Sequence, residues 1–499
     1  MAGPELDHRL GAEDYAFLLM ERDNEPMNIG SVAIFEGELP YHEFLGNLSS
    51  KLHLIPRYTQ VVVPAPFDVG RPTWESDPHF DLSRHVHEVW LPQPGTREQL
   101  LDLAASLYSR PLERSKPLWE CYIVRGLDDG NSALVFVIHH CLVDGVGGVE
   151  LAMVLLDTIP NPPRVTYSHP VEPAFIPSRR RLLVDALFDD VSEWVDRAAT
   201  WQERWGTMLG ATREPGWLHS MRRALEVAIP LLALPVEKAS FNNKLSPRRR
   251  IAATALSFDE LRAVKSRIGG TVNDVATAIV SAAVGRYMAE QGERTERRSL
   301  RVLTPVNVRA PDQSGRMGNR ISMLLVEVPL WEMAPAERVR AVSERMKWLK
   351  SEDAGGGIEM IGTELLSLPT PLLKAFAAFG SPPNTLANMI CTNVAGPVMP
   401  LYSVGHRLLH LHGLAPISWE MAINCAVTTY NGEITFTWVV DPDAVLDLER
   451  LNGRLFEAYE EMRLAAGVRR EITVEEVELT MVVLNRDEPR RRSRSIPAA

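Results

Sequence analysis

Two adjacent histidines follow a run of apolar residues, and a carboxylate and a glycine follow them within one turn. The run extends from Ala133 to Ile138, and the residues after it are His139, His140, Cys141, Leu142, Val143, Asp144 and Gly145. A short apolar run bounded by polar residues predicts a buried strand. The histidines therefore mark the point where a strand meets a loop, and a cleft could reach a titratable base there.

His140 is predicted to be the working base of this segment. Successive strand side chains point to opposite faces, which argues against a metal shared by the two imidazoles. A neutral imidazole has its pKa near working pH and can take a proton from an alcohol. Asp144 is expected to fix the loop by pairing with an arginine, for which Arg309 is the first candidate and Arg301 and Arg320 are rivals. Packing or hydrogen bonding is the alternative role of the pair.

Cys141 is an alternative nucleophile, because a thiol beside a histidine can attack a carbonyl carbon. The adjacent strand positions point apart, which favours direct transfer without a covalent intermediate. Gly145 allows a tight turn into a helix, whose free N–H groups could stabilise an oxyanion. The sequence has no GxSxG motif, so a serine-esterase site is not expected.

The chain resembles the bacterial wax ester synthase/diacylglycerol acyltransferases, a branch of the CoA-dependent acyltransferase and condensation-domain superfamily. His139 to Gly145 has that superfamily's HHxxxDG pattern. The other matching segments, in the family's order, are Asp14–Glu21, Pro26–Gly30, Pro117–Glu120, Thr271–Val275, Pro305–Arg309, Gly318–Asn319, Asn393–Pro397, Pro400–Tyr402 and Tyr430–Gly432. Small departures from the family pattern, at Ala395, Ala422 and Thr437, bear on pocket shape and leave His140 in place.

This resemblance implies an α/β (α+β) fold of two chloramphenicol-acetyltransferase-like domains. Each would hold a mixed sheet with flanking helices, with a substrate tunnel at the interface. The implied reaction moves a long-chain acyl group from acyl-CoA, as co-substrate, to diacylglycerol or a long-chain alcohol, without a metal or other cofactor. The implied catalytic residues are His140, His139, Asp144 and Gly145, and the implied substrate-binding residues are Asn273, Asp274 and Arg309.

A structural role competes with substrate binding at Asn273 and Asp274. Thr271 has the spacing of a helix N-cap, and Asp274 lies in the first helical turn, where a carboxylate satisfies free N–H groups and complements the helix dipole. Two other functions also stay open. One is a condensation-type transferase with a carrier-bound donor or another acceptor, and the other is a catalytically weak lipid- or CoA-binding paralogue, because fold does not fix function.

The length of 499 residues suits two domains. We expect residues 1–160 to form the N-terminal domain, 161–250 a crossover, 251–485 the C-terminal domain and 486–499 a basic, disordered tail. The formal net charge of -11 disfavours a nucleic-acid partner. Scattered cysteines and the lack of a secretory signal predict a cytoplasmic protein.

The sequence has no apolar window long enough to span a membrane, so any membrane contact is expected to be peripheral. The crossover contains an apolar stripe at helical spacing, formed by Leu187, Val191, Trp194, Ala198, Trp201, Trp205 and Met208. Such a helix could lie on the inner membrane or a lipid droplet, or it could pack on the protein's own core.

Strands are expected over residues 31–35, 60–63, 119–124, 133–138, 251–256 and 300–306. Helices are expected over residues 96–109, 146–158, 257–269 and 271–291.

Overall fold

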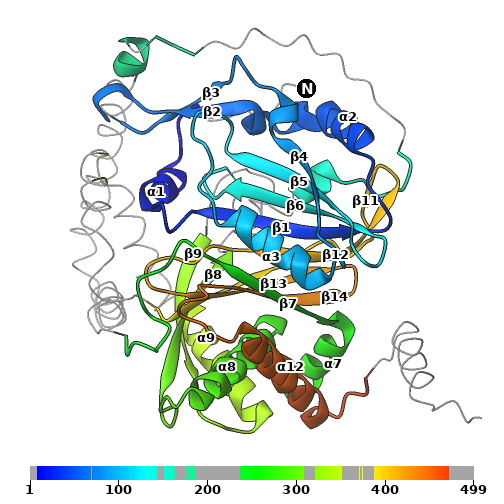
Figure 1. The fold of residues 1–499 in the computed structure, drawn as a ribbon. Coiled ribbons are helices and arrows are strands. Elements are labelled where there is room, and N and C mark those ends of the chain that lie inside the picture. Colours follow the sequence, from blue (N-terminus) through cyan, green and yellow to red (C-terminus); the bar gives the residue numbers. More distant parts are fainter. Residues whose placement is uncertain are drawn as a thin grey trace, which may run out of the picture.

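Two mixed six-stranded sheets form the frame of the protein (Figure 1). The computed structural model describes residues 8–68, 70–142, 151–162, 176–178, 180–185, 236–307, 321–350, 370, 374 and 387–470. The first sheet has the order β11 (Tyr402–Ser403), β12 (His406–Leu414), β1 (Asn28–Phe35), β6 (Ser132–His139), β5 (Trp119–Arg125) and β4 (Val86–Trp90). The second has the order β7 (Arg250–Ser257), β14 (Glu433–Val440), β13 (Ile423–Tyr430), β10 (Met389–Val394), β8 (Ser299–Asn307) and β9 (Ile321–Pro329).

Both sheets combine parallel and antiparallel neighbours. In the first sheet β4 and β5 run parallel, and in the second β10 runs parallel to both β8 and β13. A separate two-stranded sheet joins β2 (Gln60–Val63) to β3 (Thr73–Ser76). The predicted mixed α/β architecture is confirmed, whereas the predicted tunnel between the domains stays a prediction.

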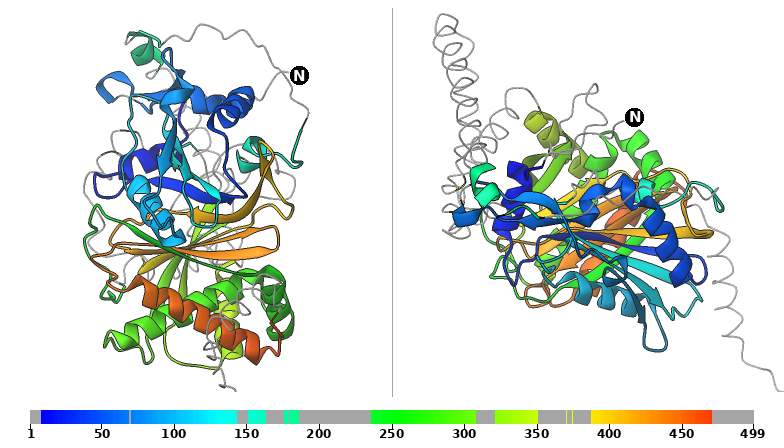
Figure 2. Two further views of the ribbon diagram at one scale, coloured as in Figure 1. Left: turned by 45° about the vertical axis from the view of Figure 1, so that its right-hand side comes forward. Right: turned by 90° about the horizontal axis from the view of Figure 1, so that it is seen from above.

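Helices cover the second sheet on the side away from the first (Figures 1 and 2). They are α7 (Phe258–Ile268), α8 (Val272–Glu290), α9 (Pro335–Lys350) and α12 (Leu448–Ala465). α8 is buried along most of its length, and a Cβ on its Gly285 would lie 2.3 Å from the Leu330 carbonyl oxygen. Only glycine allows that close approach. The large apolar core of this half fills the space between these helices and the sheet.

The N-terminal half contains α1 (Ala12–Met20), α2 (Tyr41–Lys51) and α3 (Arg97–Tyr108). Short 3₁₀ turns cover Leu52–Leu54, Pro56–Thr59, Pro66–Asp68 and Leu82–Arg84. The core around α3 includes Ile251 of β7 and Val439 of β14, so the apolar packing is continuous between the two halves.

Strands β11 and β12 connect the two halves in a way that the predicted domain boundaries do not describe. Residues 402–414 lie inside the range predicted for the C-terminal domain, yet β12 pairs antiparallel with β1 from Gly30–Leu414 to Phe35–Leu408. The first sheet is therefore completed by a segment from the far end of the chain.

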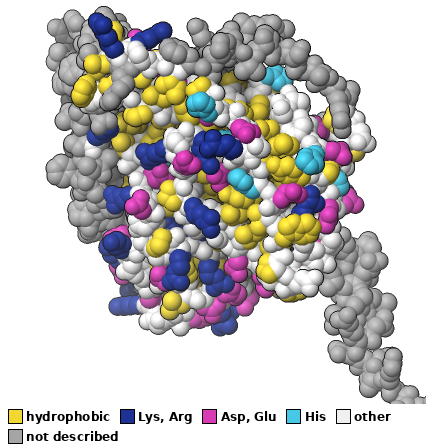
Figure 3. All heavy atoms as spheres, turned by 45° about the horizontal axis from the view of Figure 1, so that its top comes forward, with side chains coloured by type: hydrophobic (Ala, Val, Ile, Leu, Met, Phe, Trp, Pro, Cys, Tyr) yellow, Lys and Arg dark blue, Asp and Glu magenta, His cyan; other side chains and the backbone are white. Residues whose placement is uncertain are grey.

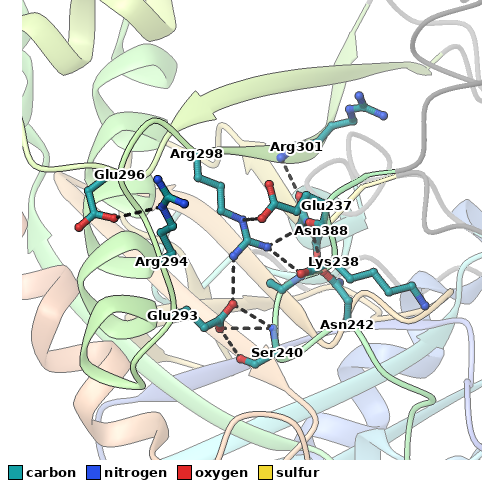
Figure 4. A network of polar contacts seen from close by, with 11 residues as sticks. Glu237, Lys238, Ser240, Asn242, Glu293, Arg294, Glu296, Arg298, Arg301 and Asn388 are labelled. Carbon is teal, nitrogen blue, oxygen red and sulfur yellow. Dashed lines mark hydrogen bonds and ion pairs between the residues drawn. The ribbon is translucent and has the colours of Figure 1, made fainter.

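A polar network anchors the chain where the crossover ends (Figure 4). The Asn388 side chain donates to the Glu237 carbonyl at 3.0 Å and to Asn242 Oδ1 at 2.8 Å, and accepts from the Arg301 N–H at 2.9 Å. Arg298 donates to the Lys238 carbonyl at 2.7 Å. Because the buried amides of Asn242 and Asn388 have partners in this network, it holds residues 237–242 against the second sheet.

The expected elements that fall in the described ranges are present, with boundaries shifted by at most a few residues. Thr271 accepts from the Asp274 N–H, so the predicted N-cap is confirmed, and Ser257 likewise accepts from the Glu260 N–H at the start of α7. Of the helix predicted from residue 146, residues 151–155 are described and are helical. The tryptophan-bearing stripe and the basic tail lie outside the described residues.

No single helix in the described ranges is both long and apolar enough to span a membrane. Within those ranges, α7 and α8 taken together are long and apolar enough, although a 97° bend separates them.

Candidate active site

The two histidines lie at the end of β6, a central strand of the first sheet. β6 pairs with β1 on one side and β5 on the other, and it ends at His139. The chain then turns through Cys141 and Leu142. Asp144, Gly145 and Arg309 lie outside the described residues, so their predicted roles stay predictions.

His140 stacks on Phe17 of α1. The two ring centroids are 3.8 Å apart and the planes differ by 10°. The His140 N–H donates to the Met27 carbonyl at 2.8 Å, and the residue as a whole is partly exposed. Its Nδ1 atom is buried and has no hydrogen-bond partner among the described residues.

Burial lowers the pKa of His140 to about 4, and the adjacent His139 adds to this effect. This pKa lies below the ordinary imidazole value that the sequence analysis assumed, because the ring loses hydration in the folded protein. At neutral pH the imidazole is uncharged, which is the form that can accept a proton.

His139 is fully buried and has a defined tautomer. Its Nδ1 accepts from the Cys141 N–H at 3.1 Å, so Nδ1 carries no proton and the proton lies on Nε2. Nε2 faces Glu21 Oε1 at 3.4 Å. Since the strand ends at His139, side-chain alternation does not extend to His140, and both rings contact the same turn of α1.

Glu21 is a site residue to which the sequence analysis gave no role. Its carboxylate accepts from Arg114 Nη2 at 2.8 Å and from the Met27 N–H at 3.3 Å. Burial acts to raise its pKa, but the contacts with His139 and Arg114 outweigh burial and lower the pKa to about 2. An anionic Glu21 therefore faces Nε2, the protonated nitrogen of His139. The sequence feature that could have identified Glu21 is the family's opening segment, Asp14–Glu21.

Cys141 is unsuited to the nucleophilic role considered for it. Its thiol is buried, and burial raises its pKa well above the ordinary value, helped by the negative charges of Asp14 and Glu21. The reactive thiolate is therefore disfavoured. No cluster of three or more His, Cys, Asp or Glu in the described part of the chain is arranged to hold a metal ion.

Asn273 and Asp274 make contacts within the protein. The Asn393 side-chain amide of β10 donates to Asn273 Oδ1 at 3.1 Å. Asp274 Oδ2 accepts from the Thr271 N–H at 2.8 Å, which completes a reciprocal capping box at the start of α8. Asp274 thus has the capping role that the sequence offered as its alternative, and substrate binding by either residue stays a prediction.

Among the arginines considered for Asp144, Arg301 alone lies in the described ranges. Its Nη2 contacts Glu327 Oε1 of the neighbouring strand at 3.2 Å, while Glu327 Oε2 contacts Arg345.

Two family models match the chain: the wax ester synthase/diacylglycerol acyltransferase catalytic domain over residues 10–276, and the C-terminal domain of the same enzymes over residues 317–463. The chain belongs to the wax ester synthase/diacylglycerol acyltransferase family. It is therefore an acyltransferase, and the resemblance inferred from its motifs is confirmed.

Curated relatives match over nearly the whole length. A probable diacylglycerol O-acyltransferase of Mycobacterium tuberculosis is 30% identical over 461 residues, covering 91% of this chain and 95% of its own. A second M. tuberculosis protein of the same description is 29% identical over 476 residues, covering 91% of this chain and 98% of its own.

Solved structures show the same fold. The wax ester synthase/diacylglycerol acyltransferase of Marinobacter aquaeolei superposes with a TM-score of 0.63 at 23% identity, covering 92% of this chain and 100% of its own. A starter condensation domain of rhizomide synthetase, in complex with C8-CoA, has a TM-score of 0.56 at 13% identity, covering 92% of this chain and 95% of its own.

Proposed function

We propose that this protein transfers a long-chain acyl group from acyl-CoA to the hydroxyl of diacylglycerol, with a long-chain alcohol as second acceptor. The observation that carries the proposal is His140, a partly exposed residue with an uncharged imidazole, placed by the family's HHxxxDG segment. The acceptor comes from the description of the mycobacterial relatives as diacylglycerol O-acyltransferases.

In the proposed reaction His140 takes the hydroxyl proton as the alcohol oxygen attacks the thioester carbonyl carbon. The tetrahedral intermediate collapses, the carbon–sulfur bond breaks, and the imidazolium returns a proton to the departing CoA thiolate. His139 keeps the turn after β6 in place through its bond from the Cys141 N–H. The transfer needs no redox step, because the thioester is already activated, and it needs no acyl-cysteine.

The acceptor preference can be measured with purified protein and palmitoyl-CoA. We expect thiol release and ester formation with diolein, and slower product formation with hexadecanol. A protein that is inactive with acyl-CoA but active with acyl-carrier-protein donors would instead be a condensation-type transferase. Retained binding of CoA without any transfer would indicate a binding paralogue.

We further propose that the protein contacts a lipid surface peripherally. An apolar groove of about 410 Å³ lies between residues 63–67 and residues 176–182. Phe67 beside it is 83% exposed, and Arg180 and Arg181 are exposed nearby in the chain. Basic and acidic side chains are mixed over the face drawn in Figure 3.

Vesicle flotation tests this contact. We expect Phe67→Ser to weaken binding to phosphatidylcholine–phosphatidylglycerol vesicles by about tenfold, the loss expected for one buried phenyl group. Leu446→Ser, at an exposed residue before α12, is the matched control. Equal binding of wild type and both variants would contradict a role for the groove.

A further inference from the structure

One turn of α1 contacts both histidines of the candidate site. Phe17 and Glu21 are four residues apart, so they lie on the same side of the helix. The Glu21 N–H donates to the Phe17 carbonyl at 3.1 Å, which closes this last turn. Glu21 faces His139, and Phe17 stacks on His140. The helix therefore contributes a separate contact to each imidazole.

The stacked contact is unusually close and parallel for an aromatic pair. Ring pairs commonly lie about 4.5–7 Å apart in offset or edge arrangements. The His140 and Phe17 centroids are 3.8 Å apart and the planes are within 10° of parallel. One whole face of the imidazole is thus covered by the phenyl ring.

The stack on Phe17 is the described ring contact that bears on the orientation of the His140 side chain. Its backbone N–H is held by the Met27 carbonyl, which fixes the main chain but not the side-chain torsions. No described residue hydrogen-bonds to Nδ1. The contact with Phe17 therefore restricts the plane of the ring.

We propose that Phe17 is a positioning residue for His140, whose ring fixes the imidazole plane and keeps water from one of its faces. This rests on the proposed function, in which His140 takes the acceptor's proton. The phenyl ring also presents its negative π face to the imidazolium that forms during transfer. The titratable groups near it are His139 at the end of β6 and Glu21 at the C-cap of α1.

The test compares Phe17→Ala, Phe17→Tyr and, as a control, Leu19→Ala, which removes a partly buried side chain from the same helix. We expect Phe17→Ala to lower kcat/KM by about tenfold to a hundredfold, the scale expected for a misplaced catalytic group. Because water then reaches the ring, the acid limb of its pH profile should move from about 4 toward the ordinary value of 6.5. Phe17→Tyr keeps the stack and should restore both properties.

A wild-type rate and pH profile in Phe17→Ala would overturn the proposal. So would equal losses in Phe17→Ala and Leu19→Ala without rescue by tyrosine, because that result describes a general packing effect. If the wild type proved inactive with every acceptor, the proposed function would fail on its own. The pH dependence of His140 carbethoxylation by diethylpyrocarbonate, followed by mass spectrometry, would still test Phe17, since a midpoint unchanged in Phe17→Ala contradicts it.

Discussion

Replacing His140 with alanine is expected to lower kcat/KM for acyl transfer by about 10²–10⁴-fold, the contribution of a positioned general base. The fold should persist, because no described residue hydrogen-bonds to His140 Nδ1 and the residue is partly exposed. Palmitoyl-CoA with diolein supplies the assay, with thiol release and ester product followed together. Thermal unfolding of the same sample shows whether the variant is still folded, so that a lower rate can be attributed to lost catalysis.

His79→Ala is a suitable control, since His79 is exposed and its backbone N–H bonds to Asp77 independently of the side chain. Near-normal turnover by His140→Ala would remove the base assignment. The pH dependence of kcat/KM in the wild type gives a second check of the base assignment. The base must be neutral to act, so kcat/KM should hold as pH falls below 6.5 and decline only as pH approaches about 4.

Replacing Glu21 with glutamine should destabilise the protein by about 2–3 kcal/mol at neutral pH and slow transfer by about tenfold. The anionic carboxylate accepts from Arg114 and Met27 and faces His139 Nε2. A glutamine amide carries no charge to match Arg114. The proton on His139 and the turn after β6 would then be less firmly fixed.

The stability part of this effect has a defined pH dependence. The folded-state pKa of Glu21 is lowered from 4.5 to about 2. Its contribution is therefore complete above pH 4.5 and is lost as pH falls toward about 2. Denaturant unfolding at neutral pH and at about pH 3 should show the gap between wild type and Glu21→Gln shrinking.

Glu98→Gln is the control for this measurement, because Glu98 is exposed in the first turn of α3. It should change stability by less than about 0.5–1 kcal/mol. A Glu21→Gln protein as stable as the wild type at neutral pH would show that the buried carboxylate does not hold the site together.

Local patterns predicted the strand that carries the motif and the helices on either side of it. The run before His139 is buried because β6 pairs on both sides, and Thr271 caps α8 as its spacing indicates. Pairing between distant segments has no such signal. β12 pairs with β1 although some 380 residues separate them in the chain. Backbone hydrogen bonds do not affect the periodicity of side chains, so the sequence does not indicate this pairing.

The same limit applies to the site. His140 could be chosen from its motif, whereas Phe17 and Glu21 act through contacts that span more than a hundred residues. The lowered pKa of His140 depends on which groups cover its ring. Those groups cannot be identified from the sequence alone. The same distinction explains why Asp274 proved to be a cap, since that contact lies within four residues.

The position of β12 also bears on how this protein can be divided. A fragment ending at residue 250 would lack β12, and the outer edge of β1 from Gly30 to Phe35 would be left with open N–H and C=O groups. An exposed apolar edge of this kind templates pairing with other chains, so such a fragment should aggregate when produced alone. Co-producing it with residues 251–499 would supply the missing strand in trans.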